Sequence, residues 1–330
     1  NLERDRVLIK ELLLIIVVIF FAMNMGASGI APSFASIYGA KFIKKRKMLL
    51  YFGIFVILGA AILGRNVALT LGKEILLKDV INFDVVLAIL GSATIGLFIA
   101  NILKIPQSTS QVTVGAIVGA GLYFQYLNLK TLFFKILPMW VILPLLSYIL
   151  TLIVYKTIYP PRHSNLYVYQ KIFANEKKIR LSALIVSCYV AFAIGTNNVA
   201  NAVGPLFAAR TLGLVSGLFL IAPLFGVGAW VMGKGTLETA GKEIVPLGLV
   251  SSTLVSFVTA SLLIFASTLG MPQSLVQLNL ASIFAISCVK NGHKHTWDQH
   301  IIQKTFFVWA ITPLISLGIS YLLLVLFLKR

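Results

Sequence analysis

Charged residues are scarce in this chain. Only 12% of its 330 residues are Asp, Glu, Lys or Arg, whereas 58% are hydrophobic. A soluble domain carries about twice that share of charge. The mean hydropathy is +0.94. This composition excludes a soluble globular protein and predicts an all-α polytopic membrane protein, held in a lipid bilayer in the cell membrane.

Residues that carry catalysis or bind metals are also few. The chain has ten acidic residues, four histidines and two cysteines. Cys188 and Cys288 both lie in apolar segments, which favours core packing over a disulfide or a metal pair. His293, His295 and His300 share one short loop, where we expect solvated side chains. No nucleophile elbow, P-loop or His-Glu-x-x-His motif occurs. We therefore expect no enzyme, no metal site and no cofactor.

Most of the charged residues are basic: 28 are Lys or Arg and 10 are Asp or Glu, which gives a net charge of +18. No soluble basic region is present to bind nucleic acid, so we attribute the excess to the positive-inside rule. The basic residues gather in loop 41–47 and in the stretch 156–180. We expect both of these to face the cytoplasm and both termini to lie outside.

Apolar segments form two sets of five. The polar stretch between the sets contains Pro160-Pro161 and reads as a linker. This division predicts a first membrane repeat at 1–155, a cytoplasmic linker at 156–180 and a second membrane repeat at 181–330. The apolar segments lie at about 8–23, 48–64, 84–103, 107–127, 132–155, 181–195, 212–233, 246–268, 273–289 and 306–328.

The two halves match each other in sequence. Five segments per half, or three crossings and a re-entrant hairpin, both give an odd number of crossings, which places the second half upside down. We therefore predict two inverted-topology repeats with broken helices and re-entrant helical hairpins, and a site at their interface. A shift of 169 residues aligns Gly26 with Gly195, Gly64-Arg65 with Gly233-Lys234, Gly72-Lys73-Glu74-Ile75 with Gly241-Lys242-Glu243-Ile244, Trp140 with Trp309 and Pro144 with Pro313.

A polar stretch interrupts the apolar pattern at residues 194–205. It carries Asn197, Asn198 and Asn201 between Gly195 and Pro205. Unpaired amides in hydrocarbon are costly, so polar, glycine-containing backbone at membrane depth is expected to line a cavity. The alternative is helix packing through small residues. A weaker copy, which includes Ser28, lies at residues 25–33.

A second motif occurs once per half. Pro106-Gln107-Ser108-Thr109-Ser110-Gln111 is matched, with a shift of 166 residues, by Pro272-Gln273-Ser274-Leu275-Val276-Gln277. Proline suits the first turn of a helix, where N–H groups lack partners and the helix dipole favours an anion. Two such tips facing each other would clamp an oxyanion; the alternative is a pair of capped helices in loops. Lys104 could pair with a dianion or reach the membrane interface.

With these motifs in view, the chain resembles the inorganic phosphate transporter family, and within it the sulfate permeases. That family carries Gly-Ala-Asn-Asp-x-Ala-Asn once per half, which appears here at 195–201 and, degenerate, at 26–32. Its Pro-x-Ser-Thr-Thr-His tip appears here at 106–111. The stretch from Phe21 to Gly29, with Asn24, also resembles the sulfate permeases.

The departures from the family pattern are specific. The motif Asp, tied to cation coupling in phosphate members, is replaced by Gly29 and Asn198, and the tip His by Gln111 and Gln277. Phosphate near neutral pH carries a proton that a carboxylate can accept, and sulfate carries none. A site without carboxylates therefore suits sulfate.

The resemblance implies a secondary active transporter that imports sulfate for assimilation by symport with protons. Thiosulfate is a further candidate substrate, and a homodimer is compatible with the family. The alternatives are a sodium- or proton-coupled phosphate transporter and, less favoured, a passive anion channel. The expected substrate-binding residues are Asn24, Ser28, Lys104, Gln107, Ser108, Thr109, Ser110, Gln111, Asn197, Asn198, Asn201, Gln273, Ser274 and Gln277.

Overall fold

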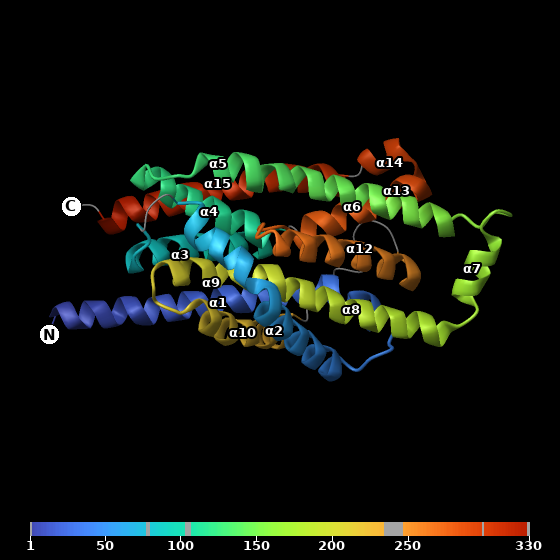
Figure 1. Ribbon diagram of the computed structural model, residues 1–330, viewed down its shortest axis with the longest axis horizontal. Coiled ribbons are helices and arrows are strands. Elements are labelled where there is room, and N and C mark those ends of the chain that lie inside the picture. The colour runs from blue at the N-terminus through green and yellow to red at the C-terminus, as the bar shows by residue number, and fades with distance from the viewer. Residues whose placement is uncertain (1, 77–79, 103–106, 234–246, 299, 329–330) are drawn as a thin grey trace.

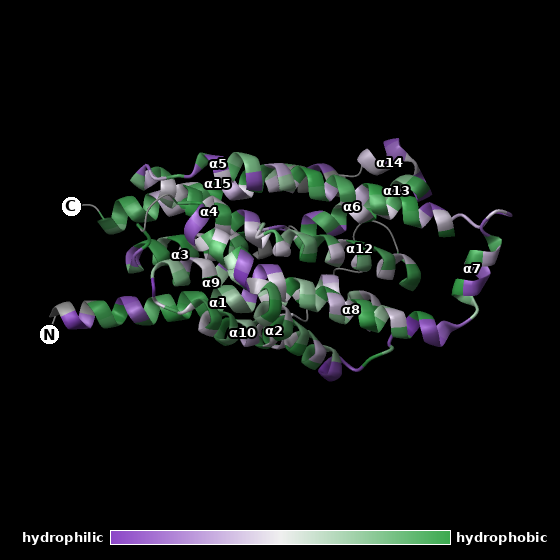
Figure 2. Cartoon of the chain, viewed as in Figure 1, coloured by the Kyte–Doolittle hydropathy of each residue, from purple (hydrophilic) through white to green (hydrophobic). Residues whose placement is uncertain are grey.

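The protein is a bundle of long helices aligned with one axis (Figure 1). The computed structural model describes residues 2–76, 80–102, 107–233, 247–298 and 300–328, and these contain no strand. Hydrophobic residues cover most of the helices (Figure 2), as expected where the surrounding solvent is lipid. Helical stretches long and apolar enough to cross a membrane are Val7–Gly39, Lys45–Glu74, Leu129–Ile158, Glu176–Ala208, Leu214–Met232, Leu249–Thr268 and Phe307–Leu328.

Helices of the two halves follow the same order. The first half contains α1 (Leu2–Gly39), α2 (Lys45–Leu69) with the π-helical turn η1 (Thr70–Glu74), α3 (Phe83–Ile102), α4 (Thr109–Phe124), α5 (Leu129–Thr131), η2 (Leu132–Ile136) and α6 (Leu137–Ile158). After α7 (Leu166–Phe173), the second half contains α8 (Glu176–Asn198), α9 (Ala200–Ala208), α10 (Leu214–Met232), α12 (Leu249–Thr268), α13 (Leu275–Asn291), α14 (His293–Trp297) and α15 (His300–Leu328).

Equivalent helices run in opposite directions. In Figure 1, α1 starts at the end that holds both termini, whereas α8 starts near α7 at the other end. Likewise, α6 runs toward α7 and α15 runs back to the C-terminus. This is the arrangement expected of inverted-topology repeats. The matched segment 241–244 lies outside the described residues.

Four glycines form the two close crossings between the halves, in which the first helix of one half meets a helix of the other half. A Cβ on Gly26 would lie 2.1 Å from the carbonyl oxygen of Phe225, and one on Gly195 would lie 2.1 Å from that of Val56. Gly59 and Gly228 make the same kind of approach to Phe192 and Met23, at 2.0 Å each. These contacts are related by the same 169-residue shift, so α1 crosses α10 as α8 crosses α2.

The last helix of each half packs on the hairpin of the other half. Ser147 on α6 donates to the carbonyl of Leu278 on α13 at 2.9 Å. Its counterpart Ser316 on α15 donates to the carbonyl of Val112 on α4, also at 2.9 Å. In membranes, buried hydroxyls of this kind hold helices together. The two halves are therefore interlocked.

The polar stretches interrupt their helices less than the sequence indicates. Helix α1 continues through Pro32 to Gly39, so the break expected at 25–33 is absent. In the second half only Val199 separates α8 from α9, and its dihedrals, φ −60° and ψ −33°, are helical. The physical reason is that Gly26 and Gly195 permit close helix crossing and do not end the helix.

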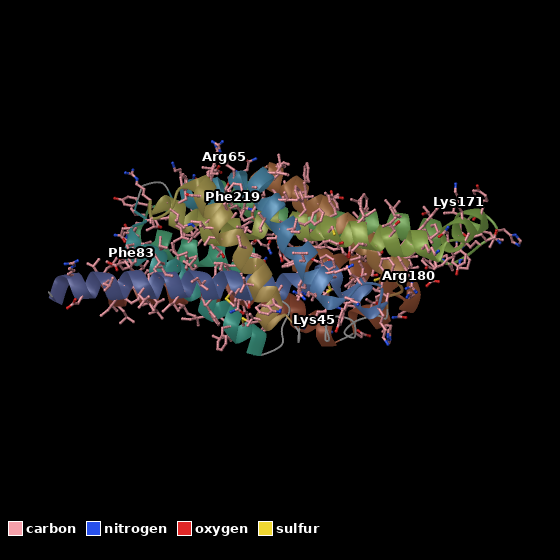
Figure 3. The ribbon with its side chains drawn as sticks, turned by 90° about the horizontal axis from the view of Figure 1, so that it is seen from below. Lys45, Arg65, Phe83, Lys171, Arg180 and Phe219 are labelled. Atoms are coloured by element: carbon pink, nitrogen blue, oxygen red, sulfur yellow. The ribbon has the colours of Figure 1, made fainter. Side chains whose placement is uncertain are left out.

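Both basic regions lie at the same end of the bundle. The Arg180 guanidinium lies 5.9 Å from the ring centroid of Phe42, which joins loop 41–44 to the start of α8. Figure 3 shows Arg180 and Lys171 toward this end and Phe83 toward the other. That this end faces the cytoplasm remains a prediction from the positive-inside rule.

Candidate functional site

Two helical hairpins enter the bundle from opposite ends and meet in its interior. Helices α3 and α4 form one hairpin, and α12 and α13 form the other (Figure 1). The tips are in direct contact, because the Ser110 hydroxyl donates to the carbonyl of Gln273 at 3.0 Å. The predicted re-entrant hairpins and the meeting of their tips are thus present in the structure.

The mirrored motif builds two equivalent helix starts. Ser108 Oγ accepts the N–H of Gln111 at 3.1 Å, and Ser274 Oγ accepts the N–H of Gln277 at 3.2 Å. Both serines have extended backbone, with φ/ψ of −87°/111° and −92°/112°. Each serine is therefore an N-cap, followed at the third helical position by Gln. The N–H groups of the two residues between Ser and Gln at each helix start lack intrahelical acceptors and carry the positive end of the helix dipole.

Asn197 holds the second tip in place. Its Oδ1 accepts the N–H of Gln273 at 3.0 Å, and its Nδ2 donates to the carbonyl of Met271 at 3.0 Å and to Ser267 Oγ at 2.9 Å. Asn197 is fully buried. This residue was predicted to line the cavity, and the structure places it behind the cavity as a cross-link.

Asn201 has a similar role at the first tip. Its Nδ2 donates to Ser110 Oγ at 3.2 Å and contacts Thr109 Oγ1 at 3.4 Å. The helix that carries the Asn-rich stretch thus contacts both hairpins. Packing, the alternative considered from the sequence, accounts for the Asn197 amide and the Asn201 Nδ2, whereas the buried Oδ1 of Asn201 has no partner within the described structure.

Ser267 is a site residue that the sequence did not reveal. It accepts from Thr196 Oγ1 and Asn197 Nδ2, both at 2.9 Å, and donates to the carbonyl of Leu263 at 2.8 Å. It fixes which way the Asn197 amide faces. Ser267 lies in an apolar helix and belongs to neither motif, so no local signal distinguishes it.

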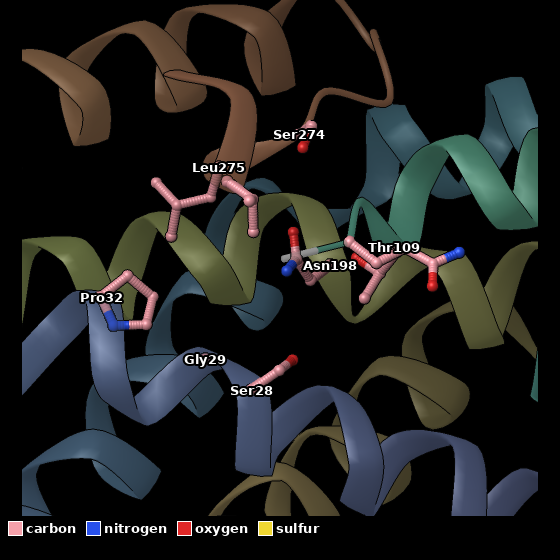
Figure 4. Close-up of a pocket in the computed structure, with 9 residues that line it drawn as sticks. Ser28, Gly29, Pro32, Thr109, Asn198, Ser274 and Leu275 are labelled. Carbon is pink, nitrogen blue, oxygen red and sulfur yellow. The ribbon is translucent and has the colours of Figure 1, made fainter. Parts of the chain in front are cut away.

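A small cavity lies between the tips and α1. About 280 Å³ of space that no atom fills lies among its lining residues, and this volume includes open solvent at its mouth. Figure 4 shows Thr109, Asn198 and Ser28 around it, with Leu275 and Pro32 on the opposite side from Thr109. None of its described lining residues is ionisable: they are Ser28, Gly29, Pro32, Gln107, Thr109, Asn198, Ser274, Leu275 and Val276.

Several buried amides around the cavity lack hydrogen-bond partners within the described structure. Both amide atoms of Gln107 and the Oδ1 of Asn198 are unpaired, although these residues are only 9% and 7% exposed. An unpaired buried polar group costs roughly 1–3 kcal/mol. Because both residues line the cavity, a bound polar ligand would supply the missing partner. Gln273 is also buried with both amide atoms unpaired, and Gln111 and Gln277 each have an unpaired Oε1.

The predicted site residues fall into groups. Asn24 is buried, and its Nδ2 contacts the carbonyl of Phe20 on its own helix at 3.4 Å. Lys104 lies outside the described residues. The predicted residues that line the cavity are Ser28, Gln107, Thr109, Asn198 and Ser274; those packed behind it are Ser108, Ser110, Gln111, Asn197, Asn201, Gln273 and Gln277.

Comparison with known proteins identifies the family. The model of the phosphate transporter family matches residues 25–174 and 163–320. The chain belongs to this family. It is 39% identical over 324 residues to the sulfate permease CysP of Bacillus subtilis, covering 97% of this chain and 88% of that protein. It is therefore a multi-pass membrane transporter of the family's sulfate permease branch.

More distant relatives share the fold. The chain is 29% identical over 157 residues to the human sodium-dependent phosphate transporter 1, covering 44% of this chain and 22% of that protein. A solved structure titled "The sodium-dependent phosphate transporter" superposes with a TM-score of 0.80 at 23% identity, covering 97% of this chain and 99% of the other. This agreement confirms the all-helical transporter fold.

Several residues that line the cavity differ from the residues that the family motifs have at the same positions. Gly29 and Asn198 stand where the resemblance places the family's motif Asp, and both line the cavity. Leu275 and Val276, which replace two tip hydroxyls, line it as well. Four of the positions at which this chain departs from the family pattern thus line the cavity, whereas Gln111 and Gln277 lie behind it.

Proposed function

We propose that the protein is a secondary active transporter that imports sulfate. The observation that carries this proposal is a small cavity between two helix starts, whose described lining is uncharged and includes hydroxyl and amide groups. Helix N-termini favour anions through free N–H donors and the helix dipole. Thr109 and Ser28 add hydroxyls, and Gln107 adds an unpaired amide. The chain's sulfate permease relative supports the same substrate.

Sulfate is favoured over phosphate by the lack of carboxylates in the described lining. A carboxylate would accept the proton of a phosphate ion and repel a fully deprotonated dianion. Gly29 and Asn198 provide neither effect, because one has no side chain and the other is neutral. An uncharged cavity therefore holds sulfate without repulsion.

We propose protons as the coupling ions. The resemblance ties the family's motif Asp to cation coupling in phosphate members, and here both motif positions are uncharged. Moving one charge against 100 mV costs about 2.3 kcal/mol, so a dianion alone faces roughly twice that. Two protons per sulfate would make the cycle electroneutral and leave the pH gradient as its driving force.

The competing function is phosphate transport coupled to sodium or to protons. It is favoured by the human relative and the solved structure, both of which are named as sodium-dependent phosphate transporters. A passive anion channel is a further alternative, which accumulation of substrate above the external concentration would exclude.

Uptake of labelled sulfate into proteoliposomes tests these functions. A pH gradient and a sodium gradient are imposed separately, each with excess unlabelled phosphate as competitor. We expect accumulation under the pH gradient that phosphate does not block. Sodium-driven uptake blocked by phosphate would replace the proposal with the phosphate function. Uptake that never exceeds equilibrium would indicate a channel.

A further inference from the structure

Helix α7 lies across one end of the helical bundle. In Figure 1 the membrane-spanning helices follow the long axis, whereas α7 runs across it, between the end of α6 and the start of α8. With eight residues, α7 is too short to cross a membrane. A helix that runs across the axis of a membrane-spanning bundle lies along the membrane plane, so α7 follows the surface of the bilayer.

The depth of α7 corresponds to the lipid headgroups. Helix α8 begins with residues 176–180 before its apolar stretch, and at about 1.5 Å per residue these span roughly 8 Å. The headgroup region outside the hydrocarbon core has a similar thickness on each side. Helix α7 therefore lies where the headgroups meet water.

One face of α7 is apolar. At about 100° per residue, roughly 160° of its surface is formed by Leu166, Val168, Tyr169, Ile172 and Phe173. The rings of Tyr169 and Phe173 lie 5.9 Å and 6.2 Å from the ring of Tyr159, which directly follows α6. These contacts turn the apolar face toward the membrane-spanning helices. On its flanks, Leu166 and Val168 are still 39% and 41% exposed.

Unpaired basic residues surround α7. The stretch 156–180 and the adjoining loop 41–47 hold eleven of the chain's 28 Lys and Arg residues and one of its ten acidic residues. That acidic residue, Glu176, pairs with Arg180. Within the described structure, the other Lys and Arg side chains of these two segments form no ion pair. This end of the bundle therefore presents positive charge that the protein itself does not neutralise.

The apolar face and the positive charge together fit an anionic bilayer surface. An amphipathic helix in the membrane plane binds by burying its apolar face at the headgroup boundary, and its basic residues attract anionic lipids. The positive-inside rule explains the side on which Lys and Arg gather, but it does not require an amphipathic helix among them. A second copy of the chain, docked symmetrically on this surface, would bring like charges together.

We propose that α7 and the basic residues around it form a binding surface for anionic phospholipids. Leu166 and Val168 insert at the level of the headgroups. Lys171, Lys177 and Lys178, all of them exposed, supply positive charge to the lipid phosphates. This surface is separate from the cavity, and the inference does not depend on which anion the protein transports.

A fluorophore on Val168→Cys tests the apolar flank. The control is Tyr167→Cys, because Tyr167 lies opposite the apolar face and is 73% exposed. In vesicles of equal parts phosphatidylcholine and phosphatidylglycerol, lipids spin-labelled just below the headgroup should quench the Val168→Cys fluorophore at least twice as strongly as the control. Aqueous iodide should show the reverse order. Equal quenching by lipid at both positions, or protection of Val168→Cys from both quenchers by a protein partner, would overturn the inference.

Lys171→Gln combined with Lys178→Gln tests the charge. In detergent, added phosphatidylglycerol should raise the Tm of the wild-type protein more than phosphatidylcholine does, because a ligand stabilises the state that it binds. The double variant should lose at least half of this additional rise. Arg65→Gln combined with Lys130→Gln removes two charges away from this end and should keep it (Figures 1 and 3). Equal responses of the two double variants would overturn the inference.

A soluble anion distinguishes a lipid surface from a site for free phosphate groups. Glycerol phosphate has the anionic group of the lipid without its acyl chains, so it should give less than half of the Tm rise at equal concentration. High salt should reduce the rise with phosphatidylglycerol, since exposed charges are screened. An equal rise with glycerol phosphate would show that the bilayer is not the partner. Neither readout requires transport, so both are independent of the proposed function.

Discussion

The side-chain carbonyl of Asn197 accepts the backbone N–H of Gln273 at 3.0 Å, which joins a membrane-spanning helix to the tip of the second hairpin. The neighbouring residue, Asn198, points to the cavity instead. Adjacent residues on a helix are about 100° apart, so one side chain can hold the tip while the next faces the substrate.

Replacing Asn197 should release the second tip. In Asn197→Ala, the Gln273 N–H and the Met271 carbonyl both lose their partner, and we expect a loss of roughly 1–3 kcal/mol in stability. Sulfate uptake should fall with it. The control is Asn66→Ala, which removes one bond of 2.9 Å to the carbonyl of Thr268 from an exposed position. Thermal unfolding in detergent should separate the two variants; equal Tm values would contradict the role of Asn197.

A carboxylate in the cavity should oppose a dianion. We expect Asn198→Asp to reduce sulfate uptake at least tenfold, because a buried like charge repels the substrate and little solvent screens it. The control is Asn175→Asp, an exposed cap of the same helix at which Asp is equally suitable. Initial uptake rates at several sulfate concentrations provide the measurement. If Asn198→Asp transported sulfate normally, the electrostatic argument for substrate choice would fail.

Glycine at the helix crossings should be irreplaceable. A Cβ on Gly195 would lie 2.1 Å from the Val56 carbonyl oxygen, so Gly195→Ala must push α8 away from α2. We expect a destabilisation of roughly 1–3 kcal/mol or more. Gly39→Ala is the control, since nothing lies within 4 Å of the Cβ that it adds. In size-exclusion chromatography after heating, the folded-protein peak of Gly195→Ala should disappear at a lower temperature than that of the wild type, whereas Gly39→Ala should behave like the wild type.

Labelling of introduced cysteines can show which end of the helical bundle faces the cytoplasm. Lys171→Cys lies in α7, at the basic end, and Lys130→Cys lies in α5, at the other end (Figure 1). The native Cys188 and Cys288 are buried and should give little background. With a membrane-impermeant maleimide on intact cells, we expect labelling of Lys130→Cys only. Labelling of Lys171→Cys alone would reverse the predicted orientation.

Local patterns were sufficient for the hairpins. Pro, a capping Ser and Gln at this spacing favour a helix start, and both predicted starts are confirmed at Ser108 and Ser274. The order of the helices also followed from the repeated motifs. These features depend on residues close together in the sequence, so they can be predicted from local sequence patterns.

Other features depend on residues far away in the chain. The sequence could not decide whether Gly26 breaks a helix or lets another helix approach, because the answer lies in Phe225 on α10. Nor could it separate Asn197 from Asn198, since only the position of the second tip determines which of them is used as a cross-link. Ser267 was missed for the same reason.

The exchange of last helices between the halves has a consequence for biosynthesis. The hairpin of α3 and α4 ends at Phe124, but its cover α15 begins at His300. Until the second tip and α15 are synthesised, the first tip has no second tip to contact, and the Val112 carbonyl has no Ser316 hydroxyl from which to accept a hydrogen bond. The first hairpin is thus inserted before the helix that covers it has been made, and α15 completes a part of the molecule that was synthesised earlier.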